Sequence, residues 1–173
     1  MTKCLVAYYS WHGNTAKVAQ AIAEELSADL EEILDAEPRA GLLGYVRSGF
    51  EAWSQLPATI KASTKSVAQY DVVILGCPVW AHHMASPMRS YILREEPNFR
   101  RVALFCTLGG AYGEQAIAAL TALCNRPPIA ELLVTAGLLK SGQWRELAID
   151  FARSLRTKTE PTKAADQHQG SQV

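Results

Sequence analysis

The chain has 173 residues, 49% of them hydrophobic, so we expect one domain with a sizeable core. Its 17 basic residues balance 17 acidic ones, which disfavours nucleic acid or an anionic membrane surface as a partner. No run reaches the roughly 20 apolar residues of a membrane span. The cysteines lack the paired spacing of a zinc site, so we expect no metal, and buried free thiols in a soluble, cytoplasmic protein: Cys4, Cys77, Cys106 and Cys124.

Five segments have the pattern of strands. Residues 4–9, 72–76 and 102–106 are short, nearly all-apolar runs, which are typical of strands buried on both faces of a parallel sheet. Residues 132–136 form a fourth such run. The acidic residues of segment 29–34 suit an edge strand, where charge discourages unwanted pairing.

Helical patterns lie between these strands, because apolar residues recur there at three- and four-residue spacing. Ser86 and Pro87 have the residue types of a helix N-cap and first turn. The predicted inner faces are Val18, Ala19, Ile22, Ala23 and Leu26, then Met88, Tyr91 and Ile92, then Ile117, Leu120 and Cys124, and last Trp144, Leu147, Ala148, Phe151 and Leu155.

Segment 41–70 interrupts this alternation and is expected to hold a helix with Val46, Phe50 and Trp53 on one face. That face would pack on the core or, in the alternative, serve a partner such as a second copy of the chain. The polar residues 157–173 have almost no apolar anchor. We therefore expect a domain of residues 1–156 followed by a flexible tail.

The repeated order of strand and helix predicts a doubly wound α/β fold with right-handed crossovers. In such a sheet, ligands bind outside the carboxyl ends of the strands. The loops after the three strongest strands are therefore expected to meet at one edge and to carry the chemistry: residues 10–15, 77–86 and 107–113.

The first loop, SWHGNT, connects the first strand to the first helix. Its hydroxyl and amide side chains, together with the amides of a helix N-terminus, could hold a phosphate with neutral donors. It lacks the ending of the nucleotide-triphosphate loop and the glycine pattern of the dinucleotide loop. The alternative is a simple turn with Asn14 or Thr15 as the helix cap.

The second loop, CPVWAHHMASP, carries Trp80, which can lie flat against a planar ring or fold back onto its own protein. His82 and His83 lack metal-ligand spacing, and are either solvated or supply a proton or positive charge near a ring. In the third loop, TLGGAYG, the glycines let the backbone pass close to a ligand, and Tyr112 offers a second flat face. Together the three loops describe a site for a planar ring that carries a phosphate.

With these motifs the sequence resembles the flavodoxin-like family, and its short-chain FMN-binding members in particular, over about residues 3–155. The stretches VAYYSWHGNTAKVAQAIAEEL, YDVVILGCPVWAHHMASPMRSYI and VALFCTLGGAYGEQAI are similar to its phosphate loop, aromatic loop and ring-edge loop. The resemblance implies a three-layer α/β/α fold, with a five-stranded parallel sheet in the order 2-1-3-4-5, and a noncovalently bound FMN. It implies three sets of FMN-binding residues: Ser10, His12, Gly13, Asn14 and Thr15 at the phosphate; Pro78, Val79, Trp80 and Ala81 beside the isoalloxazine; and Thr107, Gly109, Gly110, Tyr112 and Gly113 at the pyrimidine edge.

Two departures from this family bear on function. Its electron carriers are strongly acidic and tend to have a glycine after the ring-stacking aromatic residue, whereas this chain is neutral and has Ala81 and His82 after Trp80. A neutral or positive site stabilises reduced, anionic FMN, which favours two-electron chemistry. We therefore expect an FMN-dependent oxidoreductase that reduces quinones or similar acceptors in ping-pong fashion with NAD(P)H or a redox protein, with His82 or His83 as proton donor. The alternatives are a flavodoxin-type electron carrier and a non-catalytic binding module.

Overall fold

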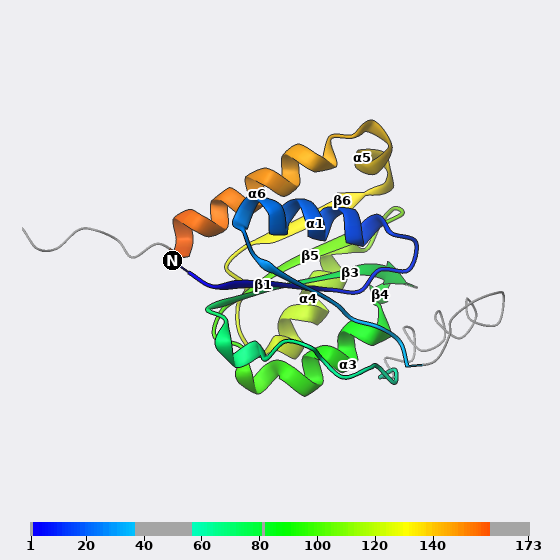
Figure 1. Cartoon of the computed structure of the whole chain (residues 1–173). Helices are drawn as coiled ribbons and strands as arrows, with labels where there is room; N and C mark the ends of the chain where they lie inside the picture. Colours follow the sequence, from blue (N-terminus) through cyan, green and yellow to red (C-terminus); the bar gives the residue numbers. More distant parts are fainter. Residues whose placement is uncertain (1, 37–56, 81, 160–173) are drawn as a thin grey trace, which may run out of the picture.

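The computed structural model describes residues 2–36, 57–80 and 82–159. Within them, the centre of the molecule is a sheet of five parallel strands (Figure 1). The order β2-β1-β3-β5-β6 confirms the predicted order of the five parallel strands, with the acidic strand at one edge. The strands are β1 (Cys4–Tyr8), β2 (Asp29–Glu32), β3 (Val72–Trp80), β5 (Val102–Leu108) and β6 (Glu131–Thr135).

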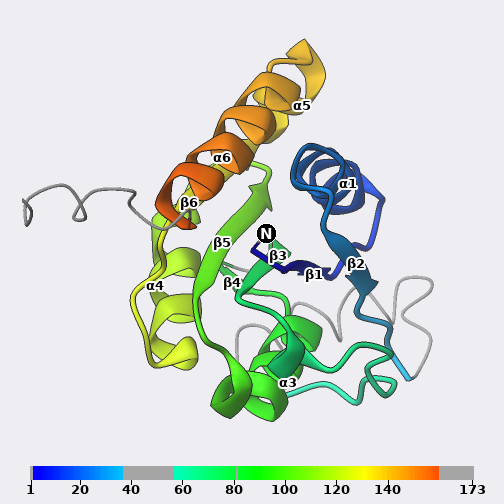
Figure 2. The ribbon, with the colours of Figure 1, turned by 60° about the vertical axis from the view of Figure 1, so that its left-hand side comes forward.

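Helices cover both faces of the sheet and complete the three-layer α/β/α fold (Figure 2). On one face lie α1 (Asn14–Leu26) and α6 (Trp144–Thr159), and on the other α3 (Ser86–Glu95) and α4 (Gly113–Cys124). Each helix pair packs on the sheet around its own apolar core. Shorter helical segments are η1 (Val67–Gln69), η2 (Glu96–Asn98) and α5 (Ala136–Ser141). None of the helices in the described ranges is long and apolar enough to cross a membrane.

The predicted inner faces of the helices are buried or partly buried, with one exception. Leu147 is 38% exposed, because the buried face of α6 begins beside it at Ala148. Ser86 is the first residue of α3 and Ala85 occupies the N-cap position, one residue earlier than predicted. Helix α6 continues to Thr159, so the expected domain end at residue 156 falls inside a helix. The predicted helix around Phe50 and residues 160–173 lie outside the described residues.

The largest departure from the predicted elements is the length of β3. Residues 77–80, predicted as loop, continue this strand, which then turns back and pairs antiparallel with β4 (His83–Met84). Pro78 favoured the loop interpretation because proline cannot donate to a sheet ladder. In the structure β1 stops pairing at Gly76, and Pro78 lies opposite Thr107 of β5. Beyond Gly76, the edge of β3 that faced β1 no longer pairs with β1, and a proline is tolerated at such a strand edge.

Gly76 lies in the middle of the sheet, between Tyr8 of β1 and Phe105 of β5. Phe105 is fully buried and its ring covers the Gly76 backbone, so that a Cβ atom added at Gly76 would lie 1.9 Å from Phe105 Cζ. Only glycine leaves room for this ring. The contact therefore sets how β3 and β5 pack immediately below the carboxyl edge of the sheet.

Candidate functional site

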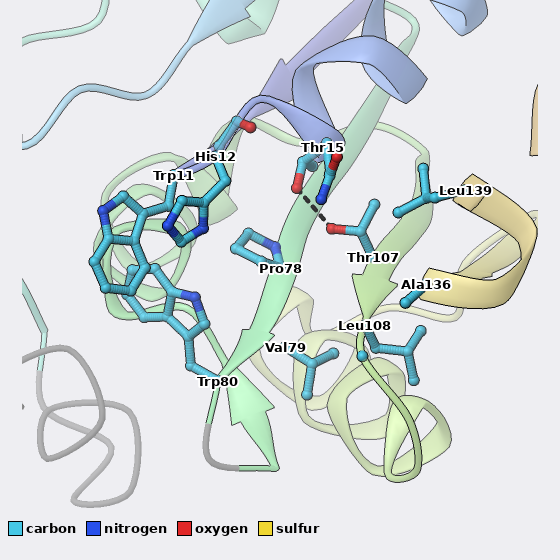
Figure 3. Close-up of a pocket in the computed structure, with 13 residues that line it drawn as sticks. Trp11, His12, Thr15, Pro78, Val79, Trp80, Thr107, Leu108, Ala136 and Leu139 are labelled. Carbon is cyan, nitrogen blue, oxygen red and sulfur yellow. Dashed lines mark hydrogen bonds between the residues drawn. The ribbon is translucent and has the colours of Figure 1, made fainter. Parts of the chain in front are cut away.

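A pocket of about 250 Å³ opens at the carboxyl edge of the sheet (Figure 3). The three predicted loops meet there, as expected for parallel strands whose carboxyl ends share one edge. Residues from each loop line the pocket: Ser10, His12, Asn14 and Thr15 from the first, Pro78, Val79 and Trp80 from the second, and Thr107 and Gly109 from the third.

The N-terminus of α1 forms the polar end of this pocket. Gly13, with a φ of 82°, occupies the N-cap position and has no side chain to cap the helix, and the first turn has no acidic residue. The alternative with Asn14 or Thr15 as the cap is therefore wrong. Ser10 Oγ accepts a hydrogen bond of 3.2 Å from the Ala16 amide and closes the loop. Because helix N-termini attract anions, this end suits a phosphate held by neutral donors.

A buried hydrogen bond connects the first loop to β5 at the back of the pocket. Thr15 Oγ1 and Thr107 Oγ1 lie 2.7 Å apart, with the residues only 1% and 5% exposed (Figure 3). Each hydroxyl gives the other a hydrogen-bond partner. This avoids the free-energy cost of burying a hydroxyl without a partner. The pair thereby holds the start of α1 against β5 and sets the spacing between two walls of the pocket.

We expect Thr15→Val and Thr107→Val each to lower the free energy of unfolding by about 1–3 kcal/mol, because each leaves the other hydroxyl buried without a partner. The free energy of unfolding of the double variant should fall by less than the sum of the two single decreases, since neither hydroxyl is then buried without a partner. Urea unfolding of the wild type and the three variants measures this cycle. Strictly additive losses would show that the two hydroxyls do not stabilise each other.

Trp80 belongs to an aromatic cluster on one side of the pocket. Its ring meets Tyr9 and Trp11 edge-on, with ring centroids 5.4 and 5.2 Å away, and Trp11 stacks on His12 at 4.7 Å. Trp80 thus packs on its own protein, as one alternative expected, and it also lines the pocket, while its contact with a planar ring stays a prediction. Trp11 also lines the pocket. Sequence analysis missed it by weighing only the polar and glycine residues of its loop.

Apolar side chains form the wall across from this cluster (Figure 3). Leu108 ends β5, and Ala136 and Leu139 come from α5, which begins directly after β6. Sequence analysis missed these residues because no polar, glycine or aromatic residue marks them. Their position was the available signal, because the residues that follow the predicted strand 132–136 lie at the same edge of the sheet as the three loops.

His82 and Tyr112, two predicted site residues, do not line the pocket but contact each other. Their ring centroids lie 3.7 Å apart, which links the β3–β4 turn to the segment between β5 and α4. Both have positive φ, 70° and 73°, a conformation that is costly for residues other than glycine. His83 pairs with Trp80 across the hairpin and is half-buried. Neither histidine therefore faces the described pocket directly.

The glycines of the third loop have different roles. Gly113 is buried at the start of α4, where an added Cβ would lie 2.9 Å from Leu133 Cδ1, so a larger residue there would displace the Leu133 side chain. At Gly109 and Gly110 an added Cβ would meet nothing within 4 Å, so no packing contact of the described chain requires glycine there. Gly109 lines the pocket and Gly110 does not. Ala81 lies outside the described residues.

The described lining of the pocket contains no Asp, Glu, Lys or Arg side chain. Behind it, Cys77 and Cys106 lie opposite each other on β3 and β5. The hydrogen bond with Cys77, together with burial, raises the pKa of Cys106 well above its ordinary value. Cys106 is therefore a thiol at neutral pH and supplies neither charge nor nucleophile. The four cysteines are free; three are buried as predicted, and Cys4 is half-buried.

Most of this chain matches one known family. The flavodoxin family matches residues 3–139, which include every lining residue of the pocket. The chain belongs to the flavodoxin family. Among solved structures, this flavodoxin-family chain is similar to a flavoprotein from Lactobacillus acidophilus NCFM in complex with FMN, with a TM-score of 0.68 and 22% identity. That alignment covers 83% of this chain and 99% of the other, and at this identity it shows a shared fold.

Two relatives carry the name NAD(P)H dehydrogenase (quinone). The protein from Chromohalobacter salexigens is 28% identical to this chain over 118 residues, and the one from Caulobacter vibrioides is 30% identical over 117. Each alignment covers 65% of this chain and 56% of the relative. The chain therefore spans about half the length of the curated relatives it matches.

Proposed function

We propose that the pocket binds FMN and that the protein is an FMN-dependent oxidoreductase. The observation that carries this proposal is the division of one pocket into an anion-attracting helix end and an aromatic, apolar region. The first turn of α1, with glycine at its N-cap position and no acidic residue, suits a phosphate monoester, and the region beside Trp80 and Pro78 suits a planar ring. A related flavoprotein that binds FMN and relatives named as quinone dehydrogenases support the same assignment.

In this proposal each wall has its own task. The α1 amides, with Ser10 and Asn14, bind the phosphate, while Trp80 contacts the ring and orients it. Leu108 and Leu139 exclude water from the opposite side. FMN, when bound, supplies the electron and hydride chemistry, and the protein supplies binding, orientation and electrostatics.

Charge supports an enzyme rather than an electron carrier. No described carboxylate lines the pocket, and the whole chain has a formal net charge of zero. Such surroundings do not repel a reduced, anionic flavin, which favours transfer of two electrons at once. We propose NAD(P)H or a redox protein as the electron donor and a quinone or similar molecule as the acceptor, each using the flavin in turn in a ping-pong scheme.

The proposed proton donor is a ring nitrogen of His82 or His83, at the turn that follows Trp80. Replacing the histidine that acts as donor with Gln should slow quinone reduction and change its dependence on pH. The dissociation constant of FMN should stay the same, since neither imidazole lines the described pocket. Stopped-flow rates measured across pH test this, and wild-type profiles in both His82→Gln and His83→Gln would exclude these residues.

The visible spectrum of the purified protein is the first test of the proposed function. A yellow protein, or one that takes up added FMN, is expected. We then expect NAD(P)H oxidation that depends on added quinone, and photoreduction that passes directly to the fully reduced flavin. A colourless protein that fails to take up FMN would refute both redox functions and leave the non-catalytic binding module.

A specific observation favours the electron carrier as the second candidate. His82 has a positive φ without being glycine, so the turn after Trp80 already has a conformation that favours glycine, the residue that electron carriers of this family tend to have after the aromatic residue. Photoreduction separates the two candidates. Accumulation of the blue one-electron form, without quinone-dependent oxidation of NAD(P)H, would support a carrier.

A further inference from the structure

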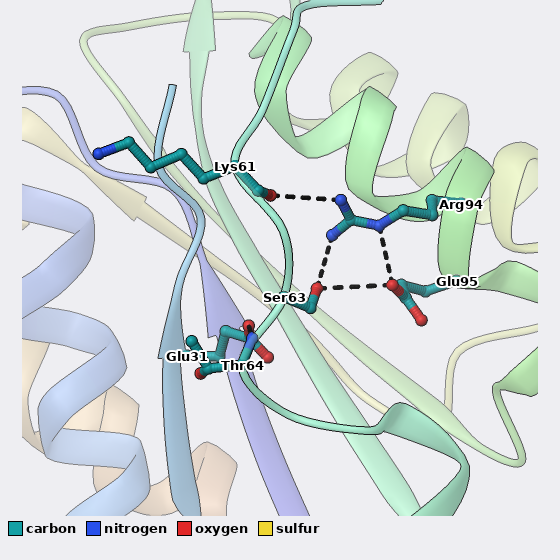
Figure 4. A network of polar contacts seen from close by, with 6 residues as sticks. All are labelled: Glu31, Lys61, Ser63, Thr64, Arg94 and Glu95. Atoms are coloured by element: carbon teal, nitrogen blue, oxygen red, sulfur yellow. Dashed lines mark hydrogen bonds and ion pairs between the residues drawn. The ribbon is translucent and has the colours of Figure 1, made fainter. Parts of the chain in front are cut away.

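A second pocket lies between β2, residues 61–64 and α3. Its volume is about 150 Å³, and none of its lining residues lines the first pocket. A polar network holds residues 61–64 in place (Figure 4). Glu31 Oε1 accepts a hydrogen bond of 2.6 Å from the Thr64 amide, and Arg94 donates to Ser63 Oγ at 2.5 Å and to the Lys61 carbonyl at 3.3 Å. The pocket therefore has walls that are fixed by specific contacts.

Two buried polar atoms of this lining have no hydrogen-bond partner. Glu31 is 5% exposed and Tyr91 is 1% exposed, yet Glu31 Oε2 and Tyr91 Oη pair with nothing in the described parts of the chain. Burial, and then the charge of Glu31, raise the pKa of Tyr91, so its phenol stays protonated at neutral pH. Buried carboxylates ordinarily have a cationic partner, and buried hydroxyls a hydrogen bond. Glu31 and Tyr91 both line the pocket, and each thus brings to it one buried polar atom without a hydrogen-bond partner.

The neighbouring cations do not satisfy this carboxylate. Arg94 Nε bonds to Glu95 Oε1 at 2.9 Å, on the far side of Ser63 (Figure 4). The Lys61 side chain extends away from Glu31 in the same view. No ion pair of the described residues includes Glu31. Within this network, Glu31 Oε2 therefore has no cationic partner.

The two unsatisfied atoms suit an ammonium group better than a metal ion. An ammonium ion has several N–H donors, which can bond a carboxylate oxygen and a phenol oxygen together. Calcium needs six or more oxygen ligands, far more than two. The remaining wall includes Ile33, Leu34 and Ala62, which suit a short alkyl chain. The volume is several times the roughly 30 Å³ that one water takes in the liquid, so a small molecule fits.

We propose that this pocket is a second binding site, for a small primary alkylammonium ion. Its N–H groups bond Glu31 Oε2 and Tyr91 Oη, and its alkyl chain lies against Ile33, Leu34 and Ala62. The bound ion neutralises the buried charge of Glu31. Because the two pockets share no lining residue, this site does not depend on the assignment of FMN to the first one.

Thermal unfolding of the full chain at constant ionic strength tests the proposal with three probes. Propylammonium chloride should raise Tm by about 3 °C or more at ten times its dissociation constant. Propanol has the same chain without the charge, and tetramethylammonium has the charge without an N–H donor; neither should raise Tm. An equal rise with either of these two probes, or no rise with propylammonium, would overturn the proposal.

Variants locate the effect within the molecule. Glu31→Gln should abolish the rise with propylammonium, and Tyr91→Phe, which keeps the buried ring, should weaken binding roughly tenfold. Glu146→Gln removes an exposed carboxylate from α6 and should keep the full rise. If Glu31→Gln does not fold, the binding of propylammonium to Tyr91→Phe alone tests the assignment to this pocket. Wild-type binding in every folded variant would overturn the assignment to this pocket.

Discussion

Gly76→Ala is expected to lower the free energy of unfolding by about 3 kcal/mol, as overpacking of a filled core does. The added Cβ would lie 1.9 Å from Phe105 Cζ and 2.1 Å from Cε1. The ring cannot move aside easily, because Phe105 is fully buried in the core below α1 and α6. The strand cannot move easily either, since the Gly76 carbonyl accepts a 2.9 Å hydrogen bond from the Tyr9 amide. Urea unfolding followed by circular dichroism measures the loss.

A second substitution and a matched control separate this clash from a general effect of alanine. Phe105→Leu shortens the ring that the new methyl group meets, so the double variant should be more stable than Gly76→Ala alone. Gly110→Ala adds the same methyl group where nothing lies within 4 Å, and should change stability by less than about 0.5 kcal/mol. Equal stability of the two single glycine variants would contradict the packing account.

Trp80→Ala is expected to raise the dissociation constant of FMN by about 10- to 100-fold, or roughly 1.4–2.8 kcal/mol. The loss arises because Trp80 supplies a broad flat surface to the pocket and its ring is held edge-on by Tyr9 and Trp11. Fluorescence titration of FMN with the protein measures the affinity. A redox titration of the bound flavin measures the accompanying shift in potential.

A conservative variant shows whether the aromatic surface itself matters. Trp80→Phe keeps a flat ring and should recover part of the lost affinity. The unliganded proteins should be compared by thermal unfolding, because Trp80 also packs on its own protein. If both the dissociation constant and the redox curve of Trp80→Ala match those of the wild type, the side chain has no role in binding the ring.

Periodicity predicted the strands and helices well because both faces of the sheet are covered. Leu104 and Phe105 are neighbours in β5 and face opposite cores, so the strand has no polar face that would disguise it. The end of β3 was not predictable in the same way. In a sequence, Pro78 indicates a loop, because the pattern does not show that β1 stops pairing with β3 at Gly76. Strand order came from the resemblance to a family, since local pattern does not encode which strands are neighbours.

The candidate site was predictable where residue types carry the signal. Ser10, Asn14 and Thr15 have polar side chains at a strand-to-helix turn, and the structure brings them to one pocket. Leu139 has no such mark, because an apolar residue that lines a pocket looks like a core residue in a sequence. Tyr112 was expected at the ring, but a contact with His82 across two loops occupies it, and such contacts depend on tertiary structure.

The position of Trp11 has a consequence for how ligands would bind. Trp11 belongs to the loop proposed to hold the phosphate, and its ring meets Trp80 of the proposed ring site. We therefore expect an event that orders one of these tryptophans to order the other as well. Thermodynamic linkage then requires the effect to be reciprocal. Inorganic phosphate should tighten the binding of riboflavin, and riboflavin should tighten the binding of phosphate by the same factor, which calorimetric titrations in both orders would measure.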